Sequence, residues 1–221
     1  MTLLLDHPLT GPHARARIAT AGAPLATAAA VVILVHGRGS DADDMLGLAR
    51  HLGRADLAVL APEAVGNTWY PGRFLEPVAR NEPWLGSALA LVDGLVGAAA
   101  AAGHPAQRIL VGGFSQGACL ALEYAWRHPG RIGAAVGLSG GLIGPLGSHA
   151  ATPGSFDGRP VFLGCNEADP HIPLDHVGET AALFRQAGAV VDERIYPGFG
   201  HAVNRDELTA LADIVEALVK A

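Results

Sequence analysis

The stretch Ile109-Leu110-Val111-Gly112-Gly113-Phe114-Ser115-Gln116-Gly117 joins an apolar run to a serine flanked by glycines, and a segment rich in Ala and Leu follows it. This pattern predicts a strand, a sharp turn at Ser115 and then a helix. A serine at such a turn has a strained backbone, so the positions two before and two after it must have almost no side chain. Gly113 and Gly117 provide that clearance. The stretch therefore predicts an exposed, nucleophilic serine at the end of a strand.

Short apolar runs alternate along the chain with longer segments of helical period, which is typical of a parallel sheet covered by helices on both faces. The predicted strands are 31–35, 57–61, 109–112, 134–138, 161–165 and 190–195. The last run contains Asp192, Glu193 and Arg194, so it is expected near an edge of the sheet. The sequence predicts an α/β fold with a mostly parallel central sheet. Because no shift of composition divides the chain, we expect one domain over residues 1–221.

Apolar residues at helical spacing predict the helices between these strands. One follows Ser40, a predicted N-cap, and a second ends near Gly103. A third stops at Gly188. The last begins at Asn204, which with Glu207 three residues later is typical of a capping box.

The composition disfavours several classes of function. Half of the 221 residues are hydrophobic and the net charge is −6, which argues against nucleic acid or an anionic membrane as a partner. The N-terminus does not resemble a signal peptide, and unbroken apolar runs such as 28–35 are too short to cross a bilayer. Cys119 and Cys165 have no metal-ligand spacing. We expect a cytoplasmic protein without metal, cofactor or stable membrane insertion. A homodimer is compatible with the sequence, which does not fix the oligomeric state.

Two segments are predicted to be long loops. Residues 140–160 are dense in Gly, Pro, Ser and Thr, which is typical of either a lid or a simple connector. Residues 66–83 gather Trp69, Tyr70 and Phe74 in a chain with only 5% aromatic residues. These three side chains are predicted to form a substrate-binding wall, and the alternative is that they pack the loop onto the core.

A serine hydroxyl needs a neutral imidazole to take its proton and a carboxylate to orient that imidazole. Asp169 and His201 lie in the loops that follow two of the predicted strands. Because the carboxyl ends of parallel strands share one edge of the sheet, both loops are expected beside Ser115. Glu167 stays open as the main alternative acid and Asp175 as a further one, since spacing alone does not decide among these carboxylates.

The chain has 10 histidines, so the choice of base rests on position. His171 lies only two residues from Asp169, which is too near in sequence for that carboxylate to orient it toward the serine. Histidines outside these loops, such as His13 and His104, are predicted to be exposed or capping residues. His201, in a glycine-lined loop before a capped helix, is the predicted base.

A developing oxyanion needs two backbone N–H groups, one from the residue after the nucleophile and one from the loop after an earlier strand. Gln116 follows the serine, and Arg38 lies in a glycine-containing loop that can curl toward the site. The predicted oxyanion donors are therefore the N–H groups of Arg38 and Gln116. The side chain of Arg38 either attracts an anionic group of the substrate or lies in solvent.

From about residue 31 onward the chain resembles the phospholipase/carboxylesterase family of α/β-hydrolases, which includes the acyl-protein thioesterases. The resemblance rests on Trp69 and on four motifs, His36-Gly37-Arg38-Gly39, Gly113-Phe114-Ser115-Gln116-Gly117-Ala118, Asp169-Pro170-His171-Ile172-Pro173 and Gly198-Phe199-Gly200-His201. It implies an α/β-hydrolase fold with Ser115 as nucleophile, His201 as base and Asp169 as acid, because the family's D-P-x-[IV]-P pattern begins there. Cys165 and Asn166 depart from the histidine and glycine that often precede the acid, and Arg38 replaces the usual apolar residue of the thioesterases.

The predicted function is a serine carboxylesterase that hydrolyses short to medium acyl esters of small molecules through an acyl-enzyme intermediate, without a cofactor. An acyl-protein thioesterase or lysophospholipase, which would prefer long acyl chains, is the first alternative. The second is a non-catalytic ligand-binding protein on the hydrolase fold, and the complete set of Ser, His and Asp argues against it.

Overall fold

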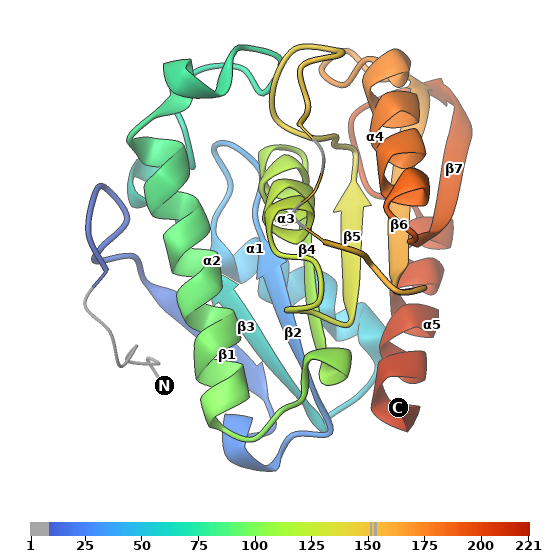
Figure 1. Cartoon of the computed structure of the whole chain (residues 1–221). Coiled ribbons are helices and arrows are strands. Elements are labelled where there is room, and N and C mark those ends of the chain that lie inside the picture. Colours follow the sequence, from blue (N-terminus) through green and yellow to red (C-terminus); the bar gives the residue numbers. More distant parts are fainter. Residues whose placement is uncertain (1–8, 151, 153) are drawn as a thin grey trace.

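The computed structural model describes residues 9–150, 152 and 154–221. Within them the chain forms a seven-stranded sheet with the strand order β1-β3-β2-β4-β5-β6-β7 (Figure 1). β1 pairs antiparallel with β3, and every other neighbouring pair is parallel. The predicted α/β fold with a mostly parallel sheet is confirmed.

The six predicted strands are all present, and one further strand joins them. The strands are β1 (Ile18–Gly22), β2 (Ala30–Val35), β3 (Leu57–Pro62), β4 (Ile109–Phe114), β5 (Ala134–Leu138), β6 (Pro160–Ala168) and β7 (Val190–Phe199). The α-helices are α1 (Ala42–Ala49), α2 (Trp84–Ala101), α3 (Gln116–Arg127), α4 (Leu174–Gln186) and α5 (Arg205–Lys220). Short 3-10 helices occupy 25–27, 50–52, 65–67, 78–81 and 106–108. β1 escaped prediction because its sequence IATAG carries one large apolar residue and is only partly buried.

Helices cover both faces of the sheet because side chains alternate along each strand. On β2, Val31, Ile33 and Val35 belong to the core beneath α2, α3 and α4, which lie in front of the sheet in Figure 1. Val32 and Leu34 point the other way, into the core shared with α1 and α5. The sheet is thus packed between two apolar layers, which hold its strand ends in place.

The start of α1 differs from the prediction. Asp41 is the N-cap instead of Ser40, and its Oδ1 accepts from the N–H groups of Asp43 and Asp44 at 2.9 and 3.0 Å. The Ser40 hydroxyl donates to the Asp44 carboxylate at 2.6 Å. A carboxylate is favoured at this position because it can accept both bonds and carries a negative charge at the positive end of the helix.

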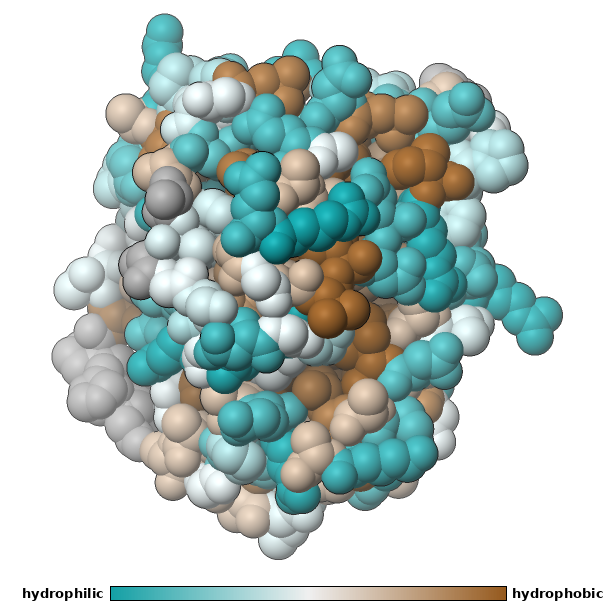
Figure 2. Space-filling view, turned by 45° about the vertical axis from the view of Figure 1, so that its right-hand side comes forward, coloured by the Kyte–Doolittle hydropathy of each residue, from teal (hydrophilic) through white to brown (hydrophobic). Residues whose placement is uncertain are grey.

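β7 lies at the edge of the sheet, as predicted, and runs four residues further than the predicted strand. Val190 and Ile195 are 64% and 40% exposed along it. Figure 2 brings this side of the molecule forward and shows mostly hydrophilic side chains, with hydrophobic residues in small patches. The extension of β7 carries the chain to the carboxyl edge of the sheet, where His201 follows two residues after the strand.

α2 has the length and apolar composition of a membrane-spanning helix, which the search for unbroken apolar runs did not anticipate. Half of the helix is buried inside the fold. Asp93, its one charged residue, accepts hydrogen bonds from the Tyr124 hydroxyl and the Arg131 guanidinium, both at 2.9 Å. The apolar composition of α2 is therefore accounted for by packing within the protein core.

The segment 140–160 connects β5 to β6, and its described residues are anchored in the fold. Leu142 is buried and its N–H donates to the Thr180 hydroxyl at 3.0 Å. The buried N–H of Ile143 donates to Glu123 at 3.0 Å. Residues 151 and 153 lie outside the described part of the chain. This anchoring favours the connector over the lid.

Candidate active site

Ser115 lies at the turn between β4 and α3 with φ 56° and ψ −120°. A positive φ is costly for a residue with a side chain and is kept only where the surroundings enforce it. A Cβ at Gly113 would collide with the carbonyl of Gly117, and a Cβ at Gly117 would collide with that of Val35. The strained turn thus rests on two glycines packed against neighbouring backbone, which is the role that the sequence predicted for them.

Three side chains from separate loops meet at this turn. The Ser115 hydroxyl lies 2.7 Å from Nε2 of His201, and Nδ1 of His201 lies 2.7 Å from Oδ2 of Asp169. Because an ionised carboxylate only accepts, Nδ1 carries the proton and Nε2 is free to accept from the serine. His201 follows β7 and Asp169 follows β6, so the parallel strands bring these residues together at one edge of the sheet. The ring of His201 also packs against those of Phe114 and His171, each 4.8 Å away between centroids.

The carboxyl of Asp169 is fully buried yet held in its charged form. Burial alone would raise its pKa, but hydrogen bonds from His201 and from the N–H groups of His171 and Ile172 outweigh this effect and lower the pKa. The two N–H groups donate to Oδ1 at 2.8 and 3.1 Å, which leaves Oδ2 to face the imidazole. Glu167, the alternative acid, is exposed and makes no hydrogen bond to His201.

Two backbone N–H groups are available beside the serine. Those of Arg38 and Gln116 donate to no residue in the described part of the chain, and both residues line the cavity that contains Ser115. Gly37 permits this approach, since a Cβ there would lie 3.3 Å from the Phe114 ring and from the Ser115 Cβ. Free donors in this position can stabilise a negatively charged oxygen on a carbon attacked by the serine.

A buried histidine and a buried tryptophan fix the loop that carries Arg38. Nε2 of His36 accepts from the Ala64 N–H at 3.0 Å, so Nδ1 donates to the Gly37 carbonyl at 2.7 Å. Burial lowers the pKa of His36, which keeps the ring neutral. The Trp69 indole donates to the His36 carbonyl at 2.8 Å. Trp69 is fully buried and does not line the cavity, which favours the alternative that it packs the loop onto the core.

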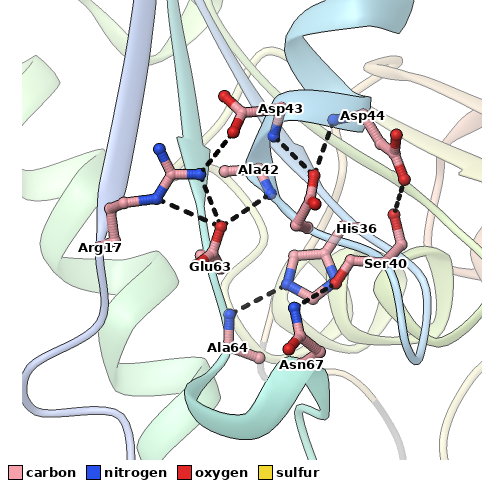
Figure 3. Close-up of polar contacts among 10 residues, drawn as sticks. Arg17, His36, Ser40, Ala42, Asp43, Asp44, Glu63, Ala64 and Asn67 are labelled. Carbon is pink, nitrogen blue, oxygen red and sulfur yellow. Dashed lines mark hydrogen bonds and ion pairs between the residues drawn. The ribbon is translucent and has the colours of Figure 1, made fainter.

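Figure 3 shows how the same loop is tied to the end of β3 and the start of α1. Glu63 accepts from Arg17 at 2.7 Å and from the N–H of Ala42 at 3.3 Å. The Asn67 side chain donates to the Ser40 carbonyl at 2.8 Å. These contacts hold the loop from both ends and leave the Arg38 N–H free at its centre.

Two further histidines are buried, contrary to the prediction that they are exposed or capping residues. The Val65 N–H donates to Nδ1 of His13 at 3.2 Å, so Nε2 donates to the Trp69 carbonyl at 2.9 Å. Nε2 of His104 lies 2.6 Å from the Leu25 carbonyl. No local sequence pattern marks these roles, because the partners are backbone groups far away along the chain.

The cavity in front of Ser115 has a volume of about 770 Å³. Its buried apolar lining consists of Met45, Tyr70, Phe74, Cys119 and Ile172. Charged residues that line it in more accessible positions are Arg38, Asp44, Arg73 and Glu76. Of the predicted wall, Tyr70 and Phe74 therefore face the cavity. Burial raises the pKa of the Cys119 thiol to about 12, so this thiol stays protonated.

Glu207 lies behind the site, and its sequence pattern marked it only as part of a helix cap. The predicted capping box is confirmed, with Asn204 and Glu207 each accepting from the other's N–H at 3.0 and 2.8 Å. Oε1 of Glu207 is buried without a partner among the described residues, and a Cβ at Gly164 would collide with it. Burial, with the charges of Asp206 and Asp169, raises the pKa of Glu207 to about 7 despite the bond from Asn204.

A mostly parallel sheet with a serine at a strand-to-helix turn, facing an imidazole and a carboxylate from later loops, defines the α/β-hydrolase class. Within the described residues, no group of His, Cys, Asp and Glu side chains is arranged to hold a metal ion. The model of the Phospholipase/Carboxylesterase family matches residues 16–219. The chain belongs to this family.

Relatives and solved structures agree with this assignment. Acyl-protein thioesterase 1 of Saccharomyces cerevisiae is 35% identical over 115 residues, which are 50% of this chain and 49% of that protein, so the chain spans about half the length of this relative. The crystal structure of a phospholipase/carboxylesterase from Dyadobacter fermentans is 36% identical, with a TM-score of 0.85 over 96% of this chain and 100% of that one. The Bacillus cereus carboxylesterase, at 20% identity and a TM-score of 0.72 over 92% and 95% of the two chains, shares the fold.

Proposed function

We propose that this protein is a serine carboxylesterase that hydrolyses esters of short to medium acyl chain length. The observation that carries the proposal is the continuous chain of contacts from Ser115 through His201 to Asp169, with 2.7 Å at each step. This is the arrangement that activates a serine hydroxyl at neutral pH.

The chemistry follows from these contacts. Nε2 of His201 takes the proton of Ser115 as its oxygen attacks the ester carbonyl, and Asp169 stabilises the imidazolium that forms. The N–H groups of Arg38 and Gln116 donate to the oxyanion, and each such donor contributes about 10²- to 10³-fold to the rate. His201 then returns the proton to the leaving alcohol. Water attacks the acyl-serine with His201 again as base, which releases the acid and restores Ser115.

The lining of the cavity supports the chain-length preference. Tyr70, Phe74 and Ile172 provide buried apolar surface in the cavity, whereas the charged Arg73 and Glu76 line it in more accessible positions. A short or medium acyl group can be covered by the apolar part alone. A long chain would also have to lie against charged groups, whose desolvation costs free energy.

Hydrolysis of long-chain thioesters is the second candidate, and the names of the fungal relatives favour it. Both candidates use the same nucleophile and differ in the length of the acyl chain and in the leaving group, which is an alcohol for an ester and a thiol for a thioester. The proposal includes a reducing, cytoplasmic environment, since both cysteines are buried free thiols.

The test combines labelling with substrate profiling. A fluorophosphonate should form a single adduct, located on Ser115 by mass spectrometry, and p-nitrophenyl esters from acetyl to palmitoyl should be cleaved fastest at the short end. Ser115→Ala should abolish the adduct and lower kcat by several orders of magnitude without unfolding the protein. Ser155→Ala, which changes an exposed serine away from the cavity, serves as the control. A palmitoyl optimum would favour the thioesterase or lysophospholipase, and the absence of both adduct and turnover would favour a binding protein.

A further inference from the structure

Two loops that line the cavity are fastened to each other along their length. The Gly39 N–H donates to the Asn67 carbonyl at 2.8 Å, and the Trp69 indole donates to the His36 carbonyl, also at 2.8 Å. Residues 36–40 carry one of the two free N–H groups beside Ser115. Residues 67–72 include Tyr70, which forms part of the apolar lining.

The side chain of Arg38 makes the densest contact between these loops. Its guanidinium donates to three successive carbonyls, those of Tyr70 at 2.8 Å, Pro71 at 3.2 Å and Gly72 at 2.6 Å. From the sequence, this side chain is expected either on an anionic group of the substrate or in solvent. Neither expectation includes these contacts, in which an exposed side chain directs its donors at backbone oxygens. Charged donors make stronger hydrogen bonds than neutral ones, and the planar guanidinium can hold several acceptors at fixed angles.

Gln116 reaches the same loop from the opposite side. Its Nε2 donates to the Tyr70 carbonyl at 2.8 Å, and its Oε1 accepts from the Trp69 N–H at 2.9 Å. The Tyr70 carbonyl thus accepts one side-chain hydrogen bond from each of the two residues whose backbone N–H groups are free beside the serine. We call this set of side-chain contacts from Arg38 and Gln116 to residues 69–72 the carbonyl clasp.

We propose that Arg38 is a positioning residue, and that the carbonyl clasp fixes the spacing between the two oxyanion-binding N–H groups by joining both to one carbonyl of the substrate wall. This inference rests on the proposed function. An acyl group that packs on the Tyr70 side chain then meets N–H groups already in place, since the carbonyl of the same residue holds both donors. A loss of alignment of about 1 Å at such donors can cost about 10²-fold in rate.

The test compares Arg38→Ala and Arg38→Lys with Arg73→Ala. Arg73 lines the same cavity, but its guanidinium makes no hydrogen bond or ion pair within the described residues, so its removal changes charge without releasing the clasp. With a p-nitrophenyl ester of short chain, Arg38→Ala should lower kcat by about 10- to 100-fold and change KM by less than about threefold. Arg38→Lys keeps the charge but cannot hold three carbonyls, so its kcat should lie between those of Arg38→Ala and the wild type.

Amide hydrogen exchange gives a readout that needs no substrate. Exchange of the Trp69 and Gly72 N–H groups should become about tenfold faster in Arg38→Ala and remain unchanged in Arg73→Ala, at equal melting temperatures. Unchanged exchange in Arg38→Ala would overturn the clasp. The clasp would also be overturned in favour of a simple charge effect if Arg38→Lys had the kcat of the wild type and Arg38→Ala differed from the wild type only in KM. If the wild type hydrolyses no ester, the proposed function fails, and the exchange rates alone decide the clasp.

Discussion

Glu207→Gln should change how the stability of this protein depends on pH. Glu207 is 1% exposed, and its pKa is about 7 in the folded protein against an ordinary value of 4.5. Between these values the folded chain keeps a proton that the unfolded chain has lost, so the free energy of unfolding falls as the pH rises. Each tenfold change in proton affinity is worth ~1.4 kcal/mol. The rise in the pKa of Glu207 therefore corresponds to about 3 kcal/mol of folding stability. This stability is present below pH 4.5 and lost by pH 8.

Glutamine removes the titration but keeps the helix cap, since its amide oxygen can accept from the Asn204 N–H. Its buried amide group adds a cost that does not vary with pH, so the informative quantity is the difference between variant and wild type as a function of pH. That difference should shift by about 3 kcal/mol in favour of Glu207→Gln between pH 4.5 and 8.

Urea unfolding followed by tryptophan fluorescence at several pH values measures this shift. Asp213→Asn is the matched control, because Asp213 is an exposed carboxylate on the same helix. Parallel curves for Glu207→Gln and wild type across this range would refute the reasoning, since they would mean that Glu207 ionises equally easily in both states.

Three further substitutions test the site. Gly117→Ala should lower the melting temperature sharply, because its Cβ would collide with the Val35 carbonyl; a variant that melts like the wild type would contradict the packing of the turn. Asp169→Asn should lower kcat by about 10³- to 10⁴-fold through loss of the His201 orientation, and nearly full activity would show that another group orients the ring. Trp69→Phe should cost about 1–3 kcal/mol in unfolding free energy and leave KM unchanged, whereas a raised KM would return Trp69 to the substrate wall.

The parallel sheet and the meeting of the three loops could be predicted from sequence because both depend on local patterns. Buried strands read as uncharged apolar runs, and their carboxyl ends share one edge. The fate of Trp69 could not be predicted, since an aromatic residue in a loop has the same local sequence whether it faces a cavity or a core. What decides it is a hydrogen bond to His36, 33 positions away.

Long-range polar contacts explain the other misses as well. From the sequence, Arg38 is expected to be a solvated or substrate-facing charge. Its acceptors are main-chain oxygens, which every residue carries, so no residue type in the sequence identifies them. Glu207 fitted a helix cap, and the sequence did not reveal that the fold would bury its second oxygen against Gly164.

The carbonyl clasp contacts only main-chain atoms, namely the carbonyl oxygens of residues 70–72 and the N–H of Trp69, and makes no demand on the side chains of these residues. Tyr70 and its neighbours can therefore be exchanged to reshape the acyl pocket while the catalytic donors keep their positions. Under the proposed function, selectivity and reactivity thus depend on different atoms of one short loop, and positions 70 and 71 are where substitutions should redirect the protein to other esters.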